Sequence, residues 1–167
     1  MLISQMSNEE CRNLLARLGF GRLAVSHEGQ PYIVPIDFAY DCDRLYGFTT
    51  VGRKVQWMRS NPRVSVEVDE VVSHFLWSSV VVLGRYEELL DTPEYEHARL
   101  QAEAKLDERA LWWQTAYAAN QPRSEHQHGK GLFYCIHIGE ISGRRATADR
   151  VESAIGLSTA QRAVREK

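Results

Sequence analysis

The chain has 167 residues, of which 44% are hydrophobic and 25% charged, with a formal net charge of -2. This length suits one domain that buries about two-thirds of its surface, and 10% aromatic residues exclude a disordered or collagenous chain. No apolar run reaches the roughly 20 residues that cross a bilayer, and no basic block could neutralise a nucleic-acid backbone. We therefore expect a cytoplasmic protein without a membrane or nucleic-acid partner.

The first predicted element is a short amphipathic helix. Ser7 and Glu10 have the S-x-x-E spacing of a capping box, in which the two side chains bind free amides of the first turn. Gly19 stands where a left-handed residue commonly ends a helix. Together these signals predict a helix from about Asn8 to Leu18.

A sheet of short strands follows, because the apolar residues then alternate with a period of two. The alternating pattern ends and restarts at turn-forming residues, so that consecutive strands form hairpins. In chain order we expect strands at 23–26 and 32–38 around a turn at 28–30, a turn at 41–43, a strand at 45–49, a helix at 52–61, and strands at 64–69, within 71–86 and at 132–142.

The run Val80-Val81-Val82-Leu83 is apolar on both faces, which is typical of a central strand. Five or six short strands with inserted helices, and no G-x-G-x-x-G between strand and helix, argue against a dinucleotide-binding α/β fold and favour an antiparallel β-barrel of α+β type.

The last third of the chain is predicted to be mainly helical before the final strand. Asp91-Thr92-Pro93-Glu94 is a strong helix start, and helical composition continues to about Ala119 with a break near Leu106. Trp112, Trp113 and Tyr117 make that stretch aromatic, which suits packing in a core or interface, or lining of a cleft. Residues 120–131 are expected to form a polar loop, and residues 146–167 a helical or disordered tail.

Motifs for metal binding and nucleophilic catalysis are absent from the sequence. Cys11, Cys42 and Cys135 are too widely spaced for a disulfide framework or a metal pair, and buried or half-buried thiols explain them. His126 and His128 form an H-x-H pair without a third ligand, so no metal site is predicted. No catalytic residue can be named.

The most informative segment joins the strand at 45–49 to the next helix. Phe48, Thr49 and Thr50 end the strand, and after Gly52 the helix begins with Arg53 and Lys54. Cations at a helix N-terminus oppose its dipole, by about 0.3–1 kcal/mol each. A phosphate bound by free amides, a hydroxyl and both cations would reverse that cost. The segment alone leaves a solvated Arg-Lys pair equally open.

Two further features are compatible with a ligand. Pro35 interrupts a strand and indicates an edge or a bulge, where neighbouring backbone groups could face a ligand or simply solvent. Ser78 and Ser79 begin the apolar strand at 80–83, and the backbone commonly satisfies such hydroxyls.

In this order, the segments resemble the pyridoxamine 5'-phosphate oxidase-like flavin-binding split barrels. The resemblance covers roughly Ser7 to Arg145 and rests on an ordered set of short motifs. These are Gly21-Arg22-Leu23-Ala24, Pro31-Tyr32-Ile33-Val34-Pro35-Ile36, Phe48-Thr49…Gly52-Arg53-Lys54, Asn61-Pro62-Arg63-Val64, Ser79-Val80-Val81-Val82-Leu83-Gly84 and Ile141-Ser142-Gly143-Arg144.

The resemblance implies a six-stranded antiparallel split β-barrel with flanking helices over residues 1–145, forming a homodimer with FMN in two interface clefts. Arg53 and Lys54 would hold the flavin phosphate, assisted by Thr49 beside Phe48. The isoalloxazine would lie along one strand, and Ser79 matches a polar position that touches the flavin. The residues of that strand are Tyr32, Ile33, Val34, Pro35 and Ile36.

The tail after Arg145 has no aromatic residue, whereas the true oxidases carry Trp and Arg there. The sequence is therefore more similar to the shorter nitroimidazole-reductase-like and flavin-nucleotide-binding relatives than to vitamin B6 oxidases. We expect an FMN-dependent oxidoreductase that passes electrons from NADH or NADPH to a small acceptor. Alternatives are a non-catalytic protein that stores or senses a flavin, and a barrel without cofactor; FAD and haem are alternative cofactors.

Overall fold

The computed structural model describes residues 1–109 and 131–148. The expected helix through Trp112, Trp113 and Tyr117, the His126–His128 pair and most of the C-terminal tail lie outside the described residues. Within the described part, no helix is long and apolar enough to span a bilayer.

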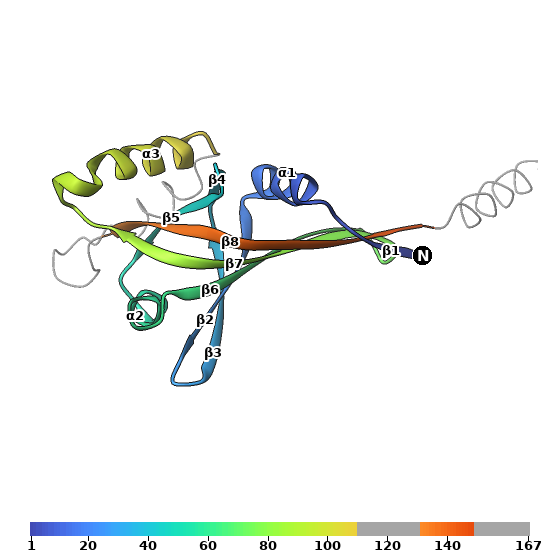
Figure 1. The fold of residues 1–167 in the computed structure, drawn as a ribbon, viewed down its shortest axis with the longest axis horizontal. Helices are drawn as coiled ribbons and strands as arrows, with labels where there is room; N and C mark the ends of the chain where they lie inside the picture. Colours follow the sequence, from blue (N-terminus) through green and yellow to red (C-terminus); the bar gives the residue numbers. More distant parts are fainter. Residues whose placement is uncertain (110–130, 149–167) are drawn as a thin grey trace, which may run out of the picture.

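Within residues 1–109 and 131–148, the fold is one antiparallel sheet with three helices and a 3₁₀ turn (Figure 1). The elements, in chain order, are β1 (Leu2–Gln5), α1 (Asn8–Leu18), β2 (Phe20–His27), β3 (Gln30–Asp37), β4 (Ala39–Asp41), β5 (Arg44–Thr50), α2 (Arg53–Ser60), β6 (Arg63–Ser73), β7 (Leu76–Leu89), η1 (Pro93–Tyr95), α3 (Glu96–Asp107) and β8 (Gly131–Thr147).

The expectation of a six-stranded barrel was wrong in strand number and in closure. The described sheet has eight strands in the order β3-β2-β6-β7-β8-β5-β4, with β1 paired to β8, and it does not close. The two additional strands are β1 and β4, which are only four and three residues long. Such short segments carry too little alternation to be recognised before their pairing partners are known.

Local signals predicted the first helix correctly. Ser7 and Glu10 form the expected capping box around α1, and Gly19 ends the helix with a left-handed φ of 65°. The β2–β3 turn also has positive φ at both central residues, 50° at Glu28 and 79° at Gly29. Positive φ at both positions matches the right-handed twist of a hairpin.

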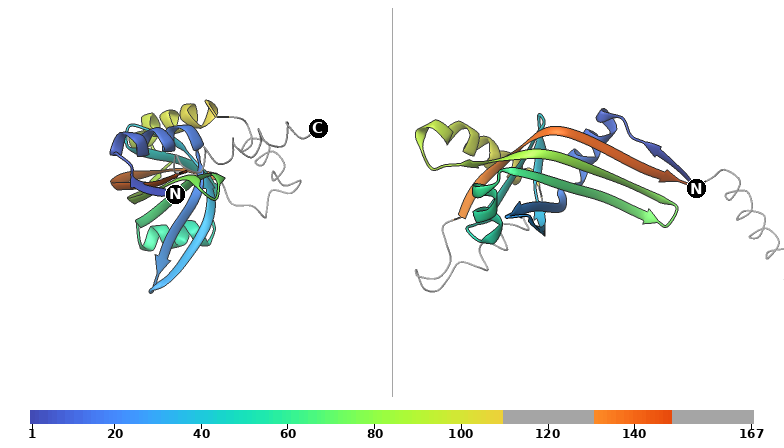
Figure 2. Two further views of the ribbon diagram at one scale, coloured as in Figure 1. Left: turned by 90° about the vertical axis from the view of Figure 1, so that its right-hand side faces the viewer. Right: turned by 60° about the horizontal axis from the view of Figure 1, so that its bottom comes forward.

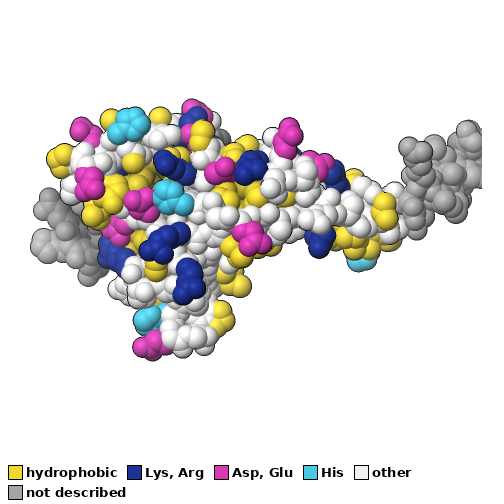
Figure 3. Space-filling model, viewed as in Figure 1, with side chains coloured by type: hydrophobic (Ala, Val, Ile, Leu, Met, Phe, Trp, Pro, Cys, Tyr) yellow, Lys and Arg dark blue, Asp and Glu magenta, His cyan; other side chains and the backbone are white. Residues whose placement is uncertain are grey.

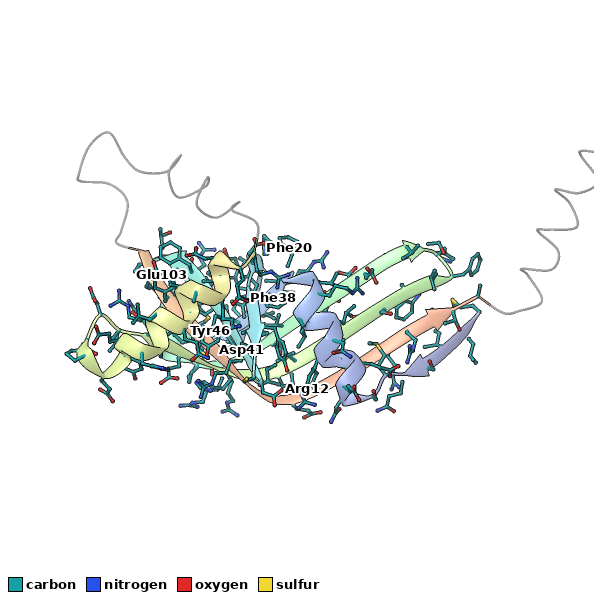
Figure 4. The ribbon with its side chains drawn as sticks, turned by 90° about the horizontal axis from the view of Figure 1, so that it is seen from above. Arg12, Phe20, Phe38, Asp41, Tyr46 and Glu103 are labelled. Atoms are coloured by element: carbon teal, nitrogen blue, oxygen red, sulfur yellow. The ribbon has the colours of Figure 1, made fainter. Side chains whose placement is uncertain are left out.

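The alternation along the strands separates a buried face from an exposed one. Side chains of β2, β5, β6, β7, β8 and α2 form the main core, which α1 covers. Figure 4 shows Phe38 and Tyr46 near α1 and α3, and Tyr46 packs with Ala102 in a second, smaller cluster. Cys11 and Cys135 are buried free thiols and Cys42 is an exposed one, so the expectation was correct for two of the three.

β7 lies between β6 and β8, as its apolar sequence predicted, but the described residues cover only one of its faces. Val80 and Val82 are fully buried, whereas Val81 is 38% and Leu83 46% exposed. The far halves of β6, β7 and β8, together with β1, project beyond the helices as an arm (Figures 1 and 2). Ala146 and Thr147 extend β8 along β1, so the tail begins later than expected.

Candidate functional site

The start of α2 offers free backbone amides. Its N-cap is Gly52, which has no side chain to accept a hydrogen bond, and the first turn contains no acidic residue. Open space surrounds the position where a Gly52 side chain would begin. No described side chain therefore caps the first-turn N–H groups, and the helix dipole adds positive potential at the same place.

Lys54 adds an uncompensated charge to this helix end. Its side chain is half-buried, and within the described part of the chain its ammonium has no ion pair or hydrogen bond. Burial lowers the pKa of Lys54, because a desolvated ammonium without an anion is unfavourable. A bound anion would remove this cost.

An aromatic group joins α2 to the edge strand β3. The guanidinium carbon of Arg53 lies 5.5 Å from the centroid of the Tyr32 ring, and Tyr32 meets Trp57 edge-on at 5.5 Å between centroids. The His27 ring also contacts Trp57, with 5.6 Å between the ring centroids. Sequence reasoning missed Trp57, although its position one turn after Arg53 places both side chains on one helix face.

β3 presents backbone groups along its free edge. Its pairing with β2 sets Pro31 opposite Ser26 and Pro35 opposite Arg22. Prolines cannot donate, so the β2–β3 bonds use the residues between them, and Ile33 directs its N–H and C=O outwards. No described strand pairs with this edge. The edge interpretation of Pro35 was therefore correct.

The remaining predicted side chains lie on β3 and β5, and those of β3 alternate between its two faces. Tyr32 and Val34 are half-buried and Ile36 is buried, whereas Ile33 is 64% exposed. At the end of β5, the Phe48 ring lies 4.9 Å from the Phe133 ring.

Thr49 completes the group that precedes α2. It is half-buried, and its hydroxyl donates to the Thr50 carbonyl at 3.3 Å. Strands β3 and β5, although not paired, contact each other. The predicted residues of β3, β5 and α2 therefore lie around the gap between β3 and β5, where the sheet does not close.

Ser79 is the exception among the predicted site residues. It lies on β7, opposite Asp69 and Arg144 in the register, and its hydroxyl donates to Glu67 Oε1 at 2.9 Å. None of these partners belongs to α2, β3 or β5. Within one chain, the structure does not bring Ser79 to the start of α2.

Candidate metal ligands are not clustered in the described residues. No group of three or more His, Cys, Asp or Glu side chains there could hold a metal ion. The site that the described residues form is therefore built from cations, backbone amides and aromatic side chains.

Comparison with known proteins identifies the family. The sequence model of the family described as pyridoxamine 5'-phosphate oxidase matches residues 7–145, and the chain belongs to this family. It is also 40% identical over 148 residues to an uncharacterized protein of Rhizobium meliloti (strain 1021), covering 89% of this chain and 98% of that protein.

Solved structures support the same fold. A crystal structure described as a FAD-binding protein from Mesorhizobium loti is 41% identical, with a TM-score of 0.73 over 88% of this chain and 100% of that one. A candidate 5-nitroimidazole antibiotic resistance protein from Bacteroides thetaiotaomicron is 15% identical, with a TM-score of 0.59 over 87% and 89% of the two chains. The latter likeness shows the fold alone.

Proposed function

We propose that the chain binds a flavin nucleotide whose phosphate lies at the start of α2. The observation that carries this proposal is the half-buried Lys54 ammonium, which has no anion among the described residues and stands beside uncapped helix amides. Arg53 supplies a second cation on the same turn and Thr49 a hydroxyl. A phosphate has the charge and the acceptor oxygens that satisfy all these donors.

The free edge of β3 suits the flavin ring. The outward N–H and C=O of Ile33 can hydrogen-bond to the polar edge of the isoalloxazine, and the neighbouring prolines leave that edge unavailable for sheet extension. The FAD-binding description of the 41% identical relative favours a flavin as the ligand. We expect FMN, with FAD as the alternative, since the phosphate of either could occupy the site.

We propose an oxidoreductase that passes electrons from NADH or NADPH to a small acceptor. The bound flavin would supply the hydride and electron-transfer chemistry. The chain would hold the phosphate through Arg53 and Lys54, orient the ring through the β3 backbone, and exclude water through neighbouring apolar side chains. No protein acid or base is assigned.

We further propose a homodimer with the flavin at the interface. Ile33, Val81 and Leu83 project from the sheet face opposite the core and are 64%, 38% and 46% exposed. Exposed apolar side chains on one face favour association. Ser79 shares this face, so a second chain would be needed to bring it towards a flavin bound at α2.

The phosphate site is tested with Arg53→Ala/Lys54→Ala. We expect the purified wild-type protein to show flavin absorption and the double variant to lose it, because both charge-assisted contacts are removed. Arg12→Ala/Arg17→Ala removes two surface cations of α1 and should retain the flavin. A double Arg53/Lys54 variant that copurifies with stoichiometric flavin would show that the site is wrong. Chromatography of the released flavin distinguishes FMN from FAD.

The alternative is a flavin-binding protein without turnover, which the purely FAD-binding description of the Mesorhizobium loti relative favours. Steady-state oxidation of NADH or NADPH with an added acceptor separates the two. Turnover that disappears in Arg53→Ala/Lys54→Ala supports the enzyme, whereas a bound flavin that neither nicotinamide reduces supports storage or sensing.

A further inference from the structure

A row of basic side chains crosses the exposed face of the sheet, away from the start of α2. Arg63 of β6 is the register partner of Arg85 of β7, and Arg85 is the partner of His137 of β8. His137 is in turn the partner of Arg44 of β5. Register partners in antiparallel strands project on the same face with their Cβ atoms about 4.5–5.5 Å apart. The four side chains therefore form one continuous line.

Arg63 and Arg85 have no compensating carboxylate in the described structure. Both are exposed, and neither side chain makes an ion pair or hydrogen bond there. Like charges on directly opposite positions destabilise a sheet. Elsewhere on this face the charges are neutralised: Arg22 of β2 forms ion pairs with Asp69 and Glu67 of β6.

Two acidic side chains, Glu87 and Glu140, lie near these cations, and Glu140 lines the cavity described below. Glu87 Oε2 lies 2.5 Å from His137 Nε2, so the imidazole occupies this carboxylate. Glu140 is opposite Leu83, beyond an irregularity in the β7–β8 pairing. Arg44 donates to the Tyr46 hydroxyl at 3.4 Å. Among the described residues, no ion pair joins Glu87 or Glu140 to Arg63 or Arg85, so both guanidinium groups keep free donors.

A cavity of about 690 Å³ opens on this part of the face. Arg63, Arg85, His137 and one carboxylate, Glu140, line it together with apolar surface from Pro31, Ala24 and Leu83. Figure 3 shows Lys and Arg side chains gathered beside a histidine on the face viewed there. Cavities of this size, mainly apolar with a few convergent polar groups, are typical of small-molecule sites.

We propose that this cavity binds a small organic oxyanion, a phosphate monoester or a carboxylate, between Arg63 and Arg85. Paired guanidinium groups match the geometry of such oxygens, and the apolar body of the ligand would lie on Pro31 and Ala24. Glu87 and Glu140 near the cations, and a net charge of -2, favour a small ligand over a nucleic acid. This site goes beyond the proposed flavin site and uses different residues.

The test measures binding of phenyl phosphate and benzoate by calorimetry, using the protein as purified with any flavin it carries. We expect one site per chain, affinity that falls with added salt, and no binding of neutral phenol. The stronger of the two anions identifies the preferred oxyanion. Arg63→Gln and Arg85→Gln should each weaken binding about tenfold or more, because each removes a charge-assisted contact.

Arg144→Gln is the matched control, since Arg144 is an exposed arginine of β8 outside this cavity. It should leave anion affinity unchanged, and flavin content should be the same in the Arg63 and Arg85 variants as in wild type. Failure of wild type to bind either anion at millimolar concentration overturns the proposal. Loss of binding in Arg53→Ala/Lys54→Ala but not in Arg63→Gln/Arg85→Gln overturns it as well, by placing the anion at α2.

Discussion

The Arg53 guanidinium lies over the Tyr32 ring, with 5.5 Å between its carbon and the ring centroid. This contact joins the first turn of α2 to β3, an edge strand whose outer backbone groups pair with no described strand. Trp57, one turn later, contacts Tyr32 from a second position. These contacts therefore place the cations that we propose to bind phosphate next to the backbone that we propose to bind the flavin ring.

Replacement of Lys54 by Met should stabilise the flavin-free protein at neutral pH. Burial lowers the pKa of Lys54 below its ordinary 10.5. Between the lowered pKa of Lys54 in the folded chain and 10.5, the unfolded chain binds more protons than the folded one. Wild-type stability therefore rises with pH over that range. We expect the advantage of Lys54→Met to shrink from neutral pH towards pH 10.5, as measured by urea unfolding.

Lys105→Met is the control for this pH series. Glu108 raises the pKa of Lys105, so this lysine stabilises the fold below its unfolded pKa and that contribution is lost at higher pH. The variant should therefore show the opposite sign or no measurable effect, since the pair is exposed. A Lys54→Met advantage that is absent, or that stays constant with pH, would mean that Lys54 is not held desolvated in the folded chain.

Met58→Ala should lower the free energy of unfolding by about 2–5 kcal/mol, because the Met58 side chain anchors α2 in the core and its removal leaves a cavity. Gln56→Ala, on the exposed side of the same helix, should change it by less than about 0.5 kcal/mol. Chemical denaturation of both variants measures the difference. Equal effects would show that α2 does not pack on the sheet as described.

Val81→Glu should convert the proposed dimer to a monomer, because it places a charge in the centre of an apolar interface. Leu100→Glu introduces the same charge at a 59% exposed position on α3 and should leave the dimer intact. Sedimentation velocity measures both masses. A wild-type protein that is monomeric at micromolar concentration would contradict the proposed assembly, and a dimeric Val81→Glu variant would place its interface elsewhere.

The sequence carried the information for local elements. The capping box at Ser7, the left-handed Gly19 and the turn at Glu28-Gly29 depend on neighbours a few residues apart, and each is found as predicted. Helical spacing also predicted which side of α2 is buried, and Val55 and Met58 are indeed its buried residues. The ordered motifs of the flavin-binding family also identified the family correctly.

Only the tertiary structure decided how distant segments pair and which charges lose their solvent. The pairing of β1 with β8 joins opposite ends of the chain, so no local pattern could indicate it. The burial of Lys54 depends on what packs around α2, and the line from Arg63 through Arg85 to His137 depends on strand register. Local propensity acts within a few residues, whereas register and desolvation are properties of contacts between segments far apart in the sequence.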